Sequence, residues 1–379
     1  MAKNLAHLGI YSDWVDAAKD QTELYPVAPP GEMTRRRISD VLGFAGLAPV
    51  ARHARVEATW ERDGLAGEEI SWSVGYGPKT RAWVLKPAGA DRPLPGVIAL
   101  HGHDGVKFFG KEKIADGKDP APVAVQNVRT DLYEGRAFAN ELAREGFVVL
   151  AHDVFLWGSR RFPFEIMPES IHRLVENWRR ARKKSALKPT EAECYEVAAK
   201  YHEHLVAKYC TLLGTTLSGV VSFEDRVAVH YLRSRSDVRT GPVGCVGLSG
   251  GGCRAALLQA TCDEIGAAVI VGMMSTHQEL LDHQVECHTW MFFPPGLARF
   301  ADWPDLAASR APSPLLVQYD RHDDLFPIEG MQAAHARIVF HYDRVGRADA
   351  YVGKFYDGPH KFDVAMQADA FAWLRTRFQ

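Results

Sequence analysis

The sequence predicts an α/β protein in which helices flank a mostly parallel central sheet. Short apolar runs such as "GVIAL" at 96–100 and "FVVLA" at 147–151 have the composition of strands that are buried on both faces. Helical patterns of about 10–15 residues separate these runs, and that alternation is typical of right-handed βαβ units. The chain of 379 residues, 46% of them hydrophobic, suffices for one large domain with insertions.

The first part of the chain predicts an extension and an antiparallel start to the sheet. Residues 1–54 combine short helical patterns with the proline-rich break "YPVAPPG", and we interpret them as an N-terminal helical extension. Alternating patterns then predict three strands, at 55–64, 68–74 and 80–87. We assign all of residues 55–379 to one α/β domain.

The rest of the chain repeats helix and strand to its end. One amphipathic helix is expected over 131–146, between the buried strands at 96–100 and 147–153. The later elements are a helix at 223–237, a strand at 241–248, a helix at 253–260, strands at 267–273 and 314–320, a helix at about 327–335, a strand from 351 and a last helix at 363–378.

Two segments interrupt this rhythm, and both leave the sheet where a strand ends. Residues 155 to about 217 are rich in helix formers and predict a helical cap, whereas residues 275–313 are rich in aromatic residues and proline and predict a wall of a pocket. Open α/β sheets bind ligands at the carboxyl ends of their strands. We therefore expect Trp157, Trp290 and Phe292 to line a substrate pocket there.

The stretch "GLSGG" predicts a nucleophile elbow at Ser249. It matches G-x-S-x-G, with a strand before it and a helix after it, and glycine at both flanking positions lets the backbone turn sharply enough to expose the serine hydroxyl. The alternative is a glycine-rich turn without chemistry. Ser218 is a weaker candidate because Thr216 replaces the first glycine.

A serine hydroxyl needs a base, and the base needs an acid to orient it. In this architecture the order along the chain is Ser, acid, His. The loop "DRHDDLFP" after the strand at 314–320 offers Asp323, with Asp324 as the reserve candidate and Asp320 as a turn former. His360, in a loop between the last strand and the last helix, is the expected base.

An oxyanion hole requires two amide donors near the nucleophile. The backbone N–H of Gly250 follows Ser249 directly, and the glycine-containing loop "HGHDG" makes the amide of His103 the expected second donor. The side chains of His101 and His103 need no chemical role in this hypothesis.

These motifs resemble those of the α/β-hydrolase superfamily. "HGHDG", "GLSGG", "DRHDDLFP" and "GPHKF" match its oxyanion loop, elbow, acid turn and histidine loop in order. The stretches "KFFGKEKIADG", "HDVFLWGSRR" and "WMFFPPGL" resemble a bacterial branch named after acetyl xylan esterases and dienelactone hydrolases. The resemblance implies an ester hydrolase without a cofactor. It departs from dienelactone hydrolases proper, which carry cysteine where this chain has Ser249.

For several other features of the sequence we expect a structural role. The stretch "YHEH" contains His202, Glu203 and His204, but its histidines do not have the spacing of the zinc motif HExxH. His283 and Cys287 form an incomplete set of metal ligands. We therefore expect no metal site. The basic run Arg179–Lys188 is a solvated helix face or steers an anionic substrate. Asp153 and Arg160 are expected to pair at the hinge of the cap.

The charge and composition of the chain disfavour some classes of function and location. A net charge of −2 disfavours a nucleic-acid partner. Neither a transmembrane stretch nor a signal peptide is evident, so we expect a cytoplasmic protein without a membrane partner. The sequence leaves the oligomeric state open, with a homodimer as one alternative. The leading hypothesis is a serine carboxylic-ester hydrolase for a compact small-molecule ester. The alternatives are a C–C bond hydrolase or peptidase of the same fold and a non-catalytic binding protein.

Overall fold

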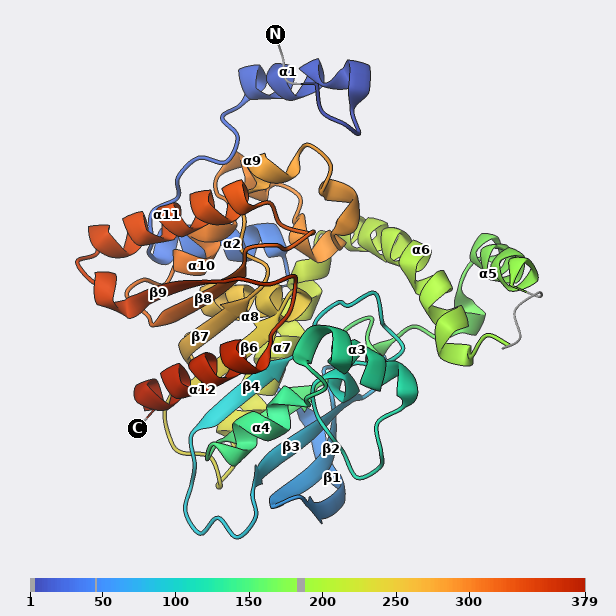
Figure 1. Ribbon diagram of the computed structural model, residues 1–379, viewed down its shortest axis with the longest axis vertical. Coiled ribbons are helices and arrows are strands. Elements are labelled where there is room, and N and C mark those ends of the chain that lie inside the picture. Colours follow the sequence, from blue (N-terminus) through green and yellow to red (C-terminus); the bar gives the residue numbers. More distant parts are fainter. Residues whose placement is uncertain (1–3, 45, 183–187, 379) are drawn as a thin grey trace.

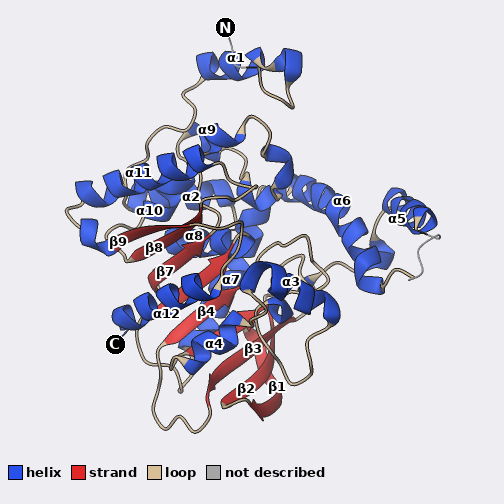
Figure 2. Cartoon of the chain, viewed as in Figure 1, coloured by secondary structure: helices blue, strands red, loops and turns tan. Residues whose placement is uncertain are grey.

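The computed structural model describes residues 4–44, 46–182 and 188–378. Within them, nine strands form one sheet in the order β1-β2-β3-β5-β4-β6-β7-β8-β9 (Figure 2). The strands are β1 (Arg52–Arg62), β2 (Leu65–Ser73), β3 (Thr80–Pro87), β4 (Gly96–Leu100), β5 (Val148–His152), β6 (Val243–Leu248), β7 (Ile265–Val271), β8 (Leu315–Asp320) and β9 (Tyr351–Tyr356).

The sheet is mixed, as expected from the sequence. β1, β2, β3 and β5 pair antiparallel in succession, whereas β5, β4, β6, β7, β8 and β9 are parallel neighbours. The five central parallel strands are buried along almost their whole length, which explains their continuous apolar sequences. The predicted mostly parallel sheet with an antiparallel start is confirmed.

Helices cover both faces of the sheet (Figure 1). The helices are α1 (Asp13–Gln21), α2 (Glu32–Leu42), α3 (Val123–Tyr133), α4 (Phe138–Arg144), α5 (Glu169–Ala181), α6 (Glu191–Leu212), α7 (Leu217–Arg233), α8 (Gly250–Thr261), α9 (His277–Leu280), α10 (Trp303–Ala308), α11 (Ile328–Arg344) and α12 (Val364–Phe378). One apolar cluster joins α4 and α12 to the sheet, and a second joins α2, α7, α8, α10 and α11 to its other face.

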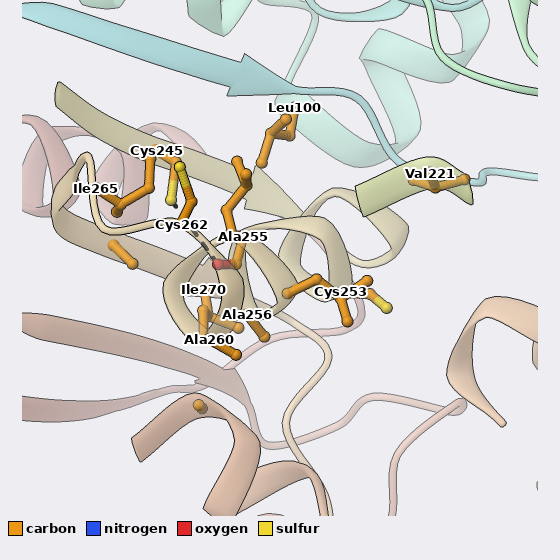
Figure 3. Close-up of a cluster of buried hydrophobic side chains, with 14 of the residues drawn as sticks. Leu100, Val221, Cys245, Cys253, Ala255, Ala256, Ala260, Cys262, Ile265 and Ile270 are labelled. Carbon is orange, nitrogen blue, oxygen red and sulfur yellow. Dashed lines mark hydrogen bonds between the residues drawn. The ribbon is translucent and has the colours of Figure 1, made fainter. Parts of the chain in front are cut away.

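The alternation of side chains along each strand divides the core between these faces. Ile98 and Leu100 of β4 belong to the cluster with α7 and α8, whereas Val97 and Ala99 belong to the cluster with α4 and α12. Small residues let α8 lie close to the sheet: Ala255 and its neighbours contact Cys245 of β6 and Ile270 of β7 (Figure 3). The Cys245 Sγ lies 3.9 Å from the Ala255 carbonyl. This packing fixes where α8 begins, and therefore the position of Ser249.

The two interrupting segments contain helices of their own. Residues 155–217 hold α5 and α6, which extend away from the sheet in Figure 1, and residues 275–313 hold α9 and α10 with short 3-10 turns. The first segment follows β5 and the second follows β7, so both leave from the carboxyl ends of parallel strands. We keep the division into extension, domain, cap and pocket wall as our interpretation.

Two expectations about elements require correction. The helix predicted over 131–146 is two helices, because Glu134 and Gly135 both have positive φ (50° and 79°) and end α3. The helix predicted from about 327 to 335 continues to Arg344, since its apolar face stays buried against α10 and β9. Residues 183–187 of the basic run lie outside the described residues.

No single helix in the described ranges has both the length and the apolar composition to cross a membrane. Only α6 and α7 taken together pass on length and composition, and the two are bent by 86° at their junction.

Candidate functional site

Ser249 lies on a sharp turn between β6 and α8. Its backbone has φ 57° and ψ −119°, a conformation that residues with a side chain rarely adopt, and its amide donates to the carbonyl of Val271 on the adjacent strand (2.8 Å). The buried strand before it and the buried helix after it hold this strained residue in place. The strand–turn–helix context predicted for Ser249 is present.

The flanking glycines allow this turn because the backbone passes very close to them. A Cβ at Gly251 would lie 2.2 Å from the carbonyl oxygen of Leu100, and a Cβ at Gly247 would lie 2.5 Å from the backbone of Gly251. Real Cβ contacts are not that short, so any side chain at these positions would displace β4 or the turn itself. The glycine pattern of the motif is therefore a packing requirement.

Asp323 and His360 meet beside the turn. Nδ1 of His360 lies 2.6 Å from Oδ2 of Asp323, whose side chain is completely buried, and the other oxygen of Asp323 accepts from the amide of Leu325 (2.8 Å). Asp324 is exposed in the same loop. The structure thus brings His360 to Asp323, the first-choice acid. Ser218, the weaker serine candidate, lies inside α7 and donates to the carbonyl of Met291 (2.8 Å).

The surroundings of His360 favour its protonated form. Burial opposes a charged ring, but the hydrogen bond to Asp323 and the negative charges of Asp323, Asp320 and Asp104 outweigh burial and raise the pKa of His360 above its usual value. Because Nδ1 faces a carboxylate, Nε2 is left to exchange a proton. This arrangement suits a group that takes up a proton during a reaction.

The two expected oxyanion donors lie side by side. A Cβ built on Gly250 would lie 2.5 Å from the amide nitrogen of His103. Gly250 is the first residue of α8, so its amide has no acceptor within the helix. Two N–H groups that lie together beside Ser249, at the positive end of a helix, suit a developing negative charge.

A buried lysine braces the loop that carries His103, and sequence reasoning missed it. Lys113 Nζ donates to the carbonyl oxygens of Gly102 (2.6 Å), His103 (3.3 Å) and Val106 (3.0 Å), and it forms an ion pair with Asp104 (2.8 Å). Burial lowers the pKa of Lys113 against the opposing effect of Asp104. Three carbonyls held by one ammonium group fix the path of this loop.

A buried glutamate connects the loop to both interrupting segments. Glu203, the acid of "YHEH", accepts from Nε2 of His103 (3.0 Å), pairs with Lys107, and accepts from the hydroxyl of Thr289 (2.7 Å) and the amide of Trp290 (2.9 Å). Against its burial, the hydrogen bond from His103 and the charge of Lys107 lower the pKa of Glu203. Its role in this structure is a junction between α6, the loop and the aromatic segment.

Ser249 and His360 line the same cavity of about 380 Å³. Residues from six parts of the chain complete its walls: His103, Asp104, Gly105, Val128, Asp131, Leu132, Gly250, Cys253, Met273, Cys287, His288, Thr289, Phe292, Leu325 and Phe326. Its volume lies near the lower end of the roughly 300–1,000 Å³ that small-molecule sites occupy.

The three aromatic residues expected in the pocket have different positions. Phe292 lines the cavity and stacks on Trp303, with ring centroids 4.9 Å apart. Trp290 lines a neighbouring cavity of about 370 Å³ and is 40% exposed. Trp157 is only 1% exposed and packs edge-on against His103, so the expectation that it faces substrate is wrong. The chain turns inward after β5, which places Trp157 behind the loop.

The predicted pair of Asp153 and Arg160 is also wrong, because each has another partner. Asp153 forms an ion pair with Lys111 (3.0 Å) and accepts from the amide of Ser159 (2.9 Å), whereas Arg160 pairs with Glu224 (2.5 Å). Each of the four charged groups is buried, so each had to find a partner of opposite charge.

One group of His, Cys, Asp or Glu side chains in the described residues has the spacing of metal ligands. One such atom from each of Asp320, Asp323 and His360 lies within 4.8 Å of the others. The hydrogen bond between His360 and Asp323 already uses two of these atoms. His283, which we considered with Cys287, accepts at Nε2 a hydrogen bond from the side-chain amide nitrogen of Gln284 (2.9 Å).

Known proteins are similar to most of this chain. No protein-family model matches it. A curated relative of Bacillus subtilis (strain 168), named "Putative hydrolase YtaP", is 26% identical over 322 residues, which are 84% of this chain and 91% of the relative.

Solved structures of esterases share the fold. A "putative acetyl xylan esterase" from Bacteroides fragilis NCTC 9343 superposes with a TM-score of 0.65 at 17% identity, over 92% of this chain and 82% of its own. A glucuronoyl esterase from Solibacter usitatus superposes with a TM-score of 0.60 at 13% identity, over 93% of this chain and 95% of its own. Acetyl xylan esterase 1 from Thermoanaerobacterium sp. JW/SL YS485 superposes with a TM-score of 0.58 at 13% identity, over 94% of this chain and 96% of its own. With its mixed sheet and its strand–turn–helix at Ser249, this chain has the α/β-hydrolase fold, which it shares with these esterases.

Proposed function

We propose that the protein is a serine hydrolase that cleaves carboxylic esters through an acyl-enzyme intermediate. The observation that carries this proposal is that Ser249, on a strained turn, shares a cavity with His360, whose other ring nitrogen is bonded to the buried Asp323. The esterase names of the structural neighbours favour an ester over the C–C and peptide bonds that the sequence left open.

Each residue has a defined part in the proposed reaction. The Oγ of Ser249 forms a bond to the ester carbonyl carbon, its proton passes to Nε2 of His360, and the carbonyl electron pair moves onto oxygen. The amides of Gly250 and His103 stabilise that oxyanion. His360 then protonates the alkoxide as its bond to the acyl carbon breaks. A water next gives its proton to His360 and bonds to the acyl carbon; the bond to Ser249 Oγ breaks, Oγ regains the proton from His360, and the acid is released. Asp323 keeps the imidazole in the required tautomer and stabilises its cation.

The dimensions of the cavity support a compact substrate. A space of about 380 Å³ between the 285–292 segment and the oxyanion loop accommodates a small ester, and its lining combines apolar side chains with the polar groups of the reaction. We propose a small-molecule ester as the substrate, with neither a cofactor nor a metal in the mechanism.

Covalent labelling tests the proposal directly. A fluorophosphonate should add one adduct to the wild-type protein, detected by intact mass, and none to Ser249→Ala. Ser249→Ala should also lose turnover of p-nitrophenyl acetate while keeping its unfolding temperature. Labelling of Ser249→Ala would place the nucleophile elsewhere, and faster turnover of peptides or β-diketones than of any ester would contradict the assigned bond.

A further inference from the structure

A third carboxyl group lies beside Asp323 and His360. Asp320 is the last residue of β8, and its side chain is buried. Its Oδ2 accepts a long hydrogen bond from the amide of Lys361 (3.3 Å), the residue directly after His360. Among the described residues, its Oδ1 accepts no hydrogen bond. A buried carboxyl with one weak partner is costly for stability alone, which points to another role.

The backbone is shaped to admit this carboxyl to the histidine. A carboxylate oxygen of Asp320 and a ring nitrogen of His360 lie within 4.8 Å of each other. Gly272, with φ +54°, lies between the two: a Cβ there would be 3.2 Å from Oδ2 of Asp320 and 3.4 Å from Cε1 of His360. Any other residue at position 272 would insert a side chain between the acid and the ring.

The charged groups around Asp320 come from several elements. Burial raises its pKa to about 8, and the negative charges of Asp323 and Asp363 act in the same direction, whereas the Lys361 amide and His360 oppose them. The charge of Asp104, in the oxyanion loop, also acts on His360. His288 of the 285–292 segment interacts electrostatically with both His360 and Asp323. Asp320 therefore gains its charge at a higher pH than an ordinary aspartate, near pH 8.

We propose that Asp320 is a positioning residue that acts through His360, as a second carboxyl group whose negative charge stabilises the imidazolium formed when Ser249 gives up its proton. The inference rests on the proposed function. Asp323 makes the hydrogen bond that orients the ring, and Asp320 adds charge to the same ring without contacting the substrate.

The proposal predicts two ionisations in the rate profile. The first is that of His360, which must be neutral to accept a proton, and the second is that of Asp320, whose charge makes the proton transfer more favourable above about pH 8. An opposite charge at this separation typically changes such an equilibrium by roughly tenfold or more. The charge of Asp320 should therefore change kcat and leave KM unchanged, because in this proposal Asp320 does not contact the substrate.

The experiment is a pH profile of kcat and KM for p-nitrophenyl acetate from pH 5 to 10, in wild type, Asp320→Asn and Asp357→Asn. Asp357 is the matched control, because its exposed carboxyl lies three residues before His360 and pairs with His322. In Asp320→Asn we expect the rise near pH 8 to disappear, kcat at pH 9 to fall roughly tenfold, and KM to stay unchanged. Asp357→Asn should follow the wild type.

The outcomes separate this inference from the function on which it rests. Superimposable profiles of wild type and Asp320→Asn, with turnover that depends on Ser249, would overturn the role of Asp320 and leave the hydrolase intact. A wild-type protein that neither reacts with fluorophosphonate nor turns over esters would overturn the function itself. If Asp320→Asn fails to fold, Asp320→Ser carries the same expectation with a smaller side chain, and a second ionisation that persists in Asp320→Ser contradicts the proposal.

Discussion

The amide nitrogen of His103 lies 2.5 Å from the point that a Cβ on Gly250 would occupy. The two residues are 147 positions apart in the chain, yet their N–H groups must converge on one oxygen atom of the substrate in the proposed reaction. Gly250 is therefore glycine because any side chain there would take the space of the second donor.

Gly250→Ala should lower kcat by roughly 10²–10³-fold, the cost of losing one oxyanion donor. The added methyl group pushes the His103 amide away, while the start of α8 tolerates alanine, so the unfolding temperature should change little. Gly46→Ala is the control, because no atom lies within 4 Å of a Cβ at Gly46. Wild-type turnover in Gly250→Ala would show that the two amides do not act together.

Asp323→Asn should reduce turnover by about 10⁴-fold, as in the serine-protease template. The amide nitrogen cannot replace the carboxylate that faces Nδ1 of His360, so the ring adopts the wrong tautomer. The exposed Asp324 lacks this contact, and Asp324→Asn should retain most of the activity. Stopped assays of both variants on p-nitrophenyl acetate compare them directly, and a larger loss in Asp324→Asn would transfer the role of the acid to that residue.

Activity should fall as the pH drops through the pKa of His360, because only the neutral ring accepts a proton. The raised pKa of His360 also makes a contribution to stability with the opposite pH dependence. The protonated ring bound to Asp323 stabilises the folded state fully below the pKa of an unfolded histidine, about 6.5, and this contribution disappears as the pH rises through the folded-state pKa. Urea titrations of wild type and His360→Gln at pH 5.5 and 9 measure it: the two should differ more at pH 5.5.

Chelation tests the alternative chemistry of the same residues. EDTA should leave the rate unchanged, because the proposed mechanism uses no metal ion and pairs His360 with Asp323 through a hydrogen bond. Activity that is lost in EDTA and restored by zinc would assign Asp320, Asp323 and His360 to a metal site.

The sequence predicted the central residues of the site because their signals are local. Ser249 needed only a strand, a glycine turn and a helix, and Asp323 and His360 followed from their places after two strands. The direction of Trp157 and the partners of Asp153 and Arg160 depend instead on segments distant in the chain, and no local pattern encodes them.

Buried charges were missed for a related reason. The sequence "KEK" at 111–113 is typical of a polar loop, yet Lys113 has no exposed surface. Glu203 is also buried, but it lies on a helix whose hydrophobic pattern is too weak to indicate which face is buried. Their partners come from other parts of the chain: the carbonyl groups of the oxyanion loop surround Lys113, and Glu203 bonds to His103, Thr289 and Trp290. Likewise the sequence predicts Asp320 as a turn former, and its position beside His360 depends on Gly272, which directly follows a different strand, β7.

Cys287 offers a chemical probe of the cavity. It is the one exposed cysteine of the six, and it lines the same space as Ser249. N-ethylmaleimide should therefore add one group to the native protein and block ester turnover, since the adduct fills part of a cavity of about 380 Å³. Cys287→Ser should be active and resistant to the reagent. Full activity of the singly modified wild type would show that substrate does not use this wall.

The same walls predict the size of the acyl group. The cavity is bounded by Phe292, Leu325 and Phe326, of which Phe292 and Phe326 are buried side chains that cannot move aside without disturbing the core. A fixed small volume favours acyl chains of roughly two to six carbons, and kcat/KM should fall steeply for longer p-nitrophenyl esters. Phe292→Leu should shift the preference to longer chains, whereas Leu212→Ala, at an exposed position on α6, should not. Rapid hydrolysis of long-chain triglycerides, with acetate and butyrate esters nearly untouched, would contradict a closed pocket and leave the roles of Ser249 and His360 unchanged.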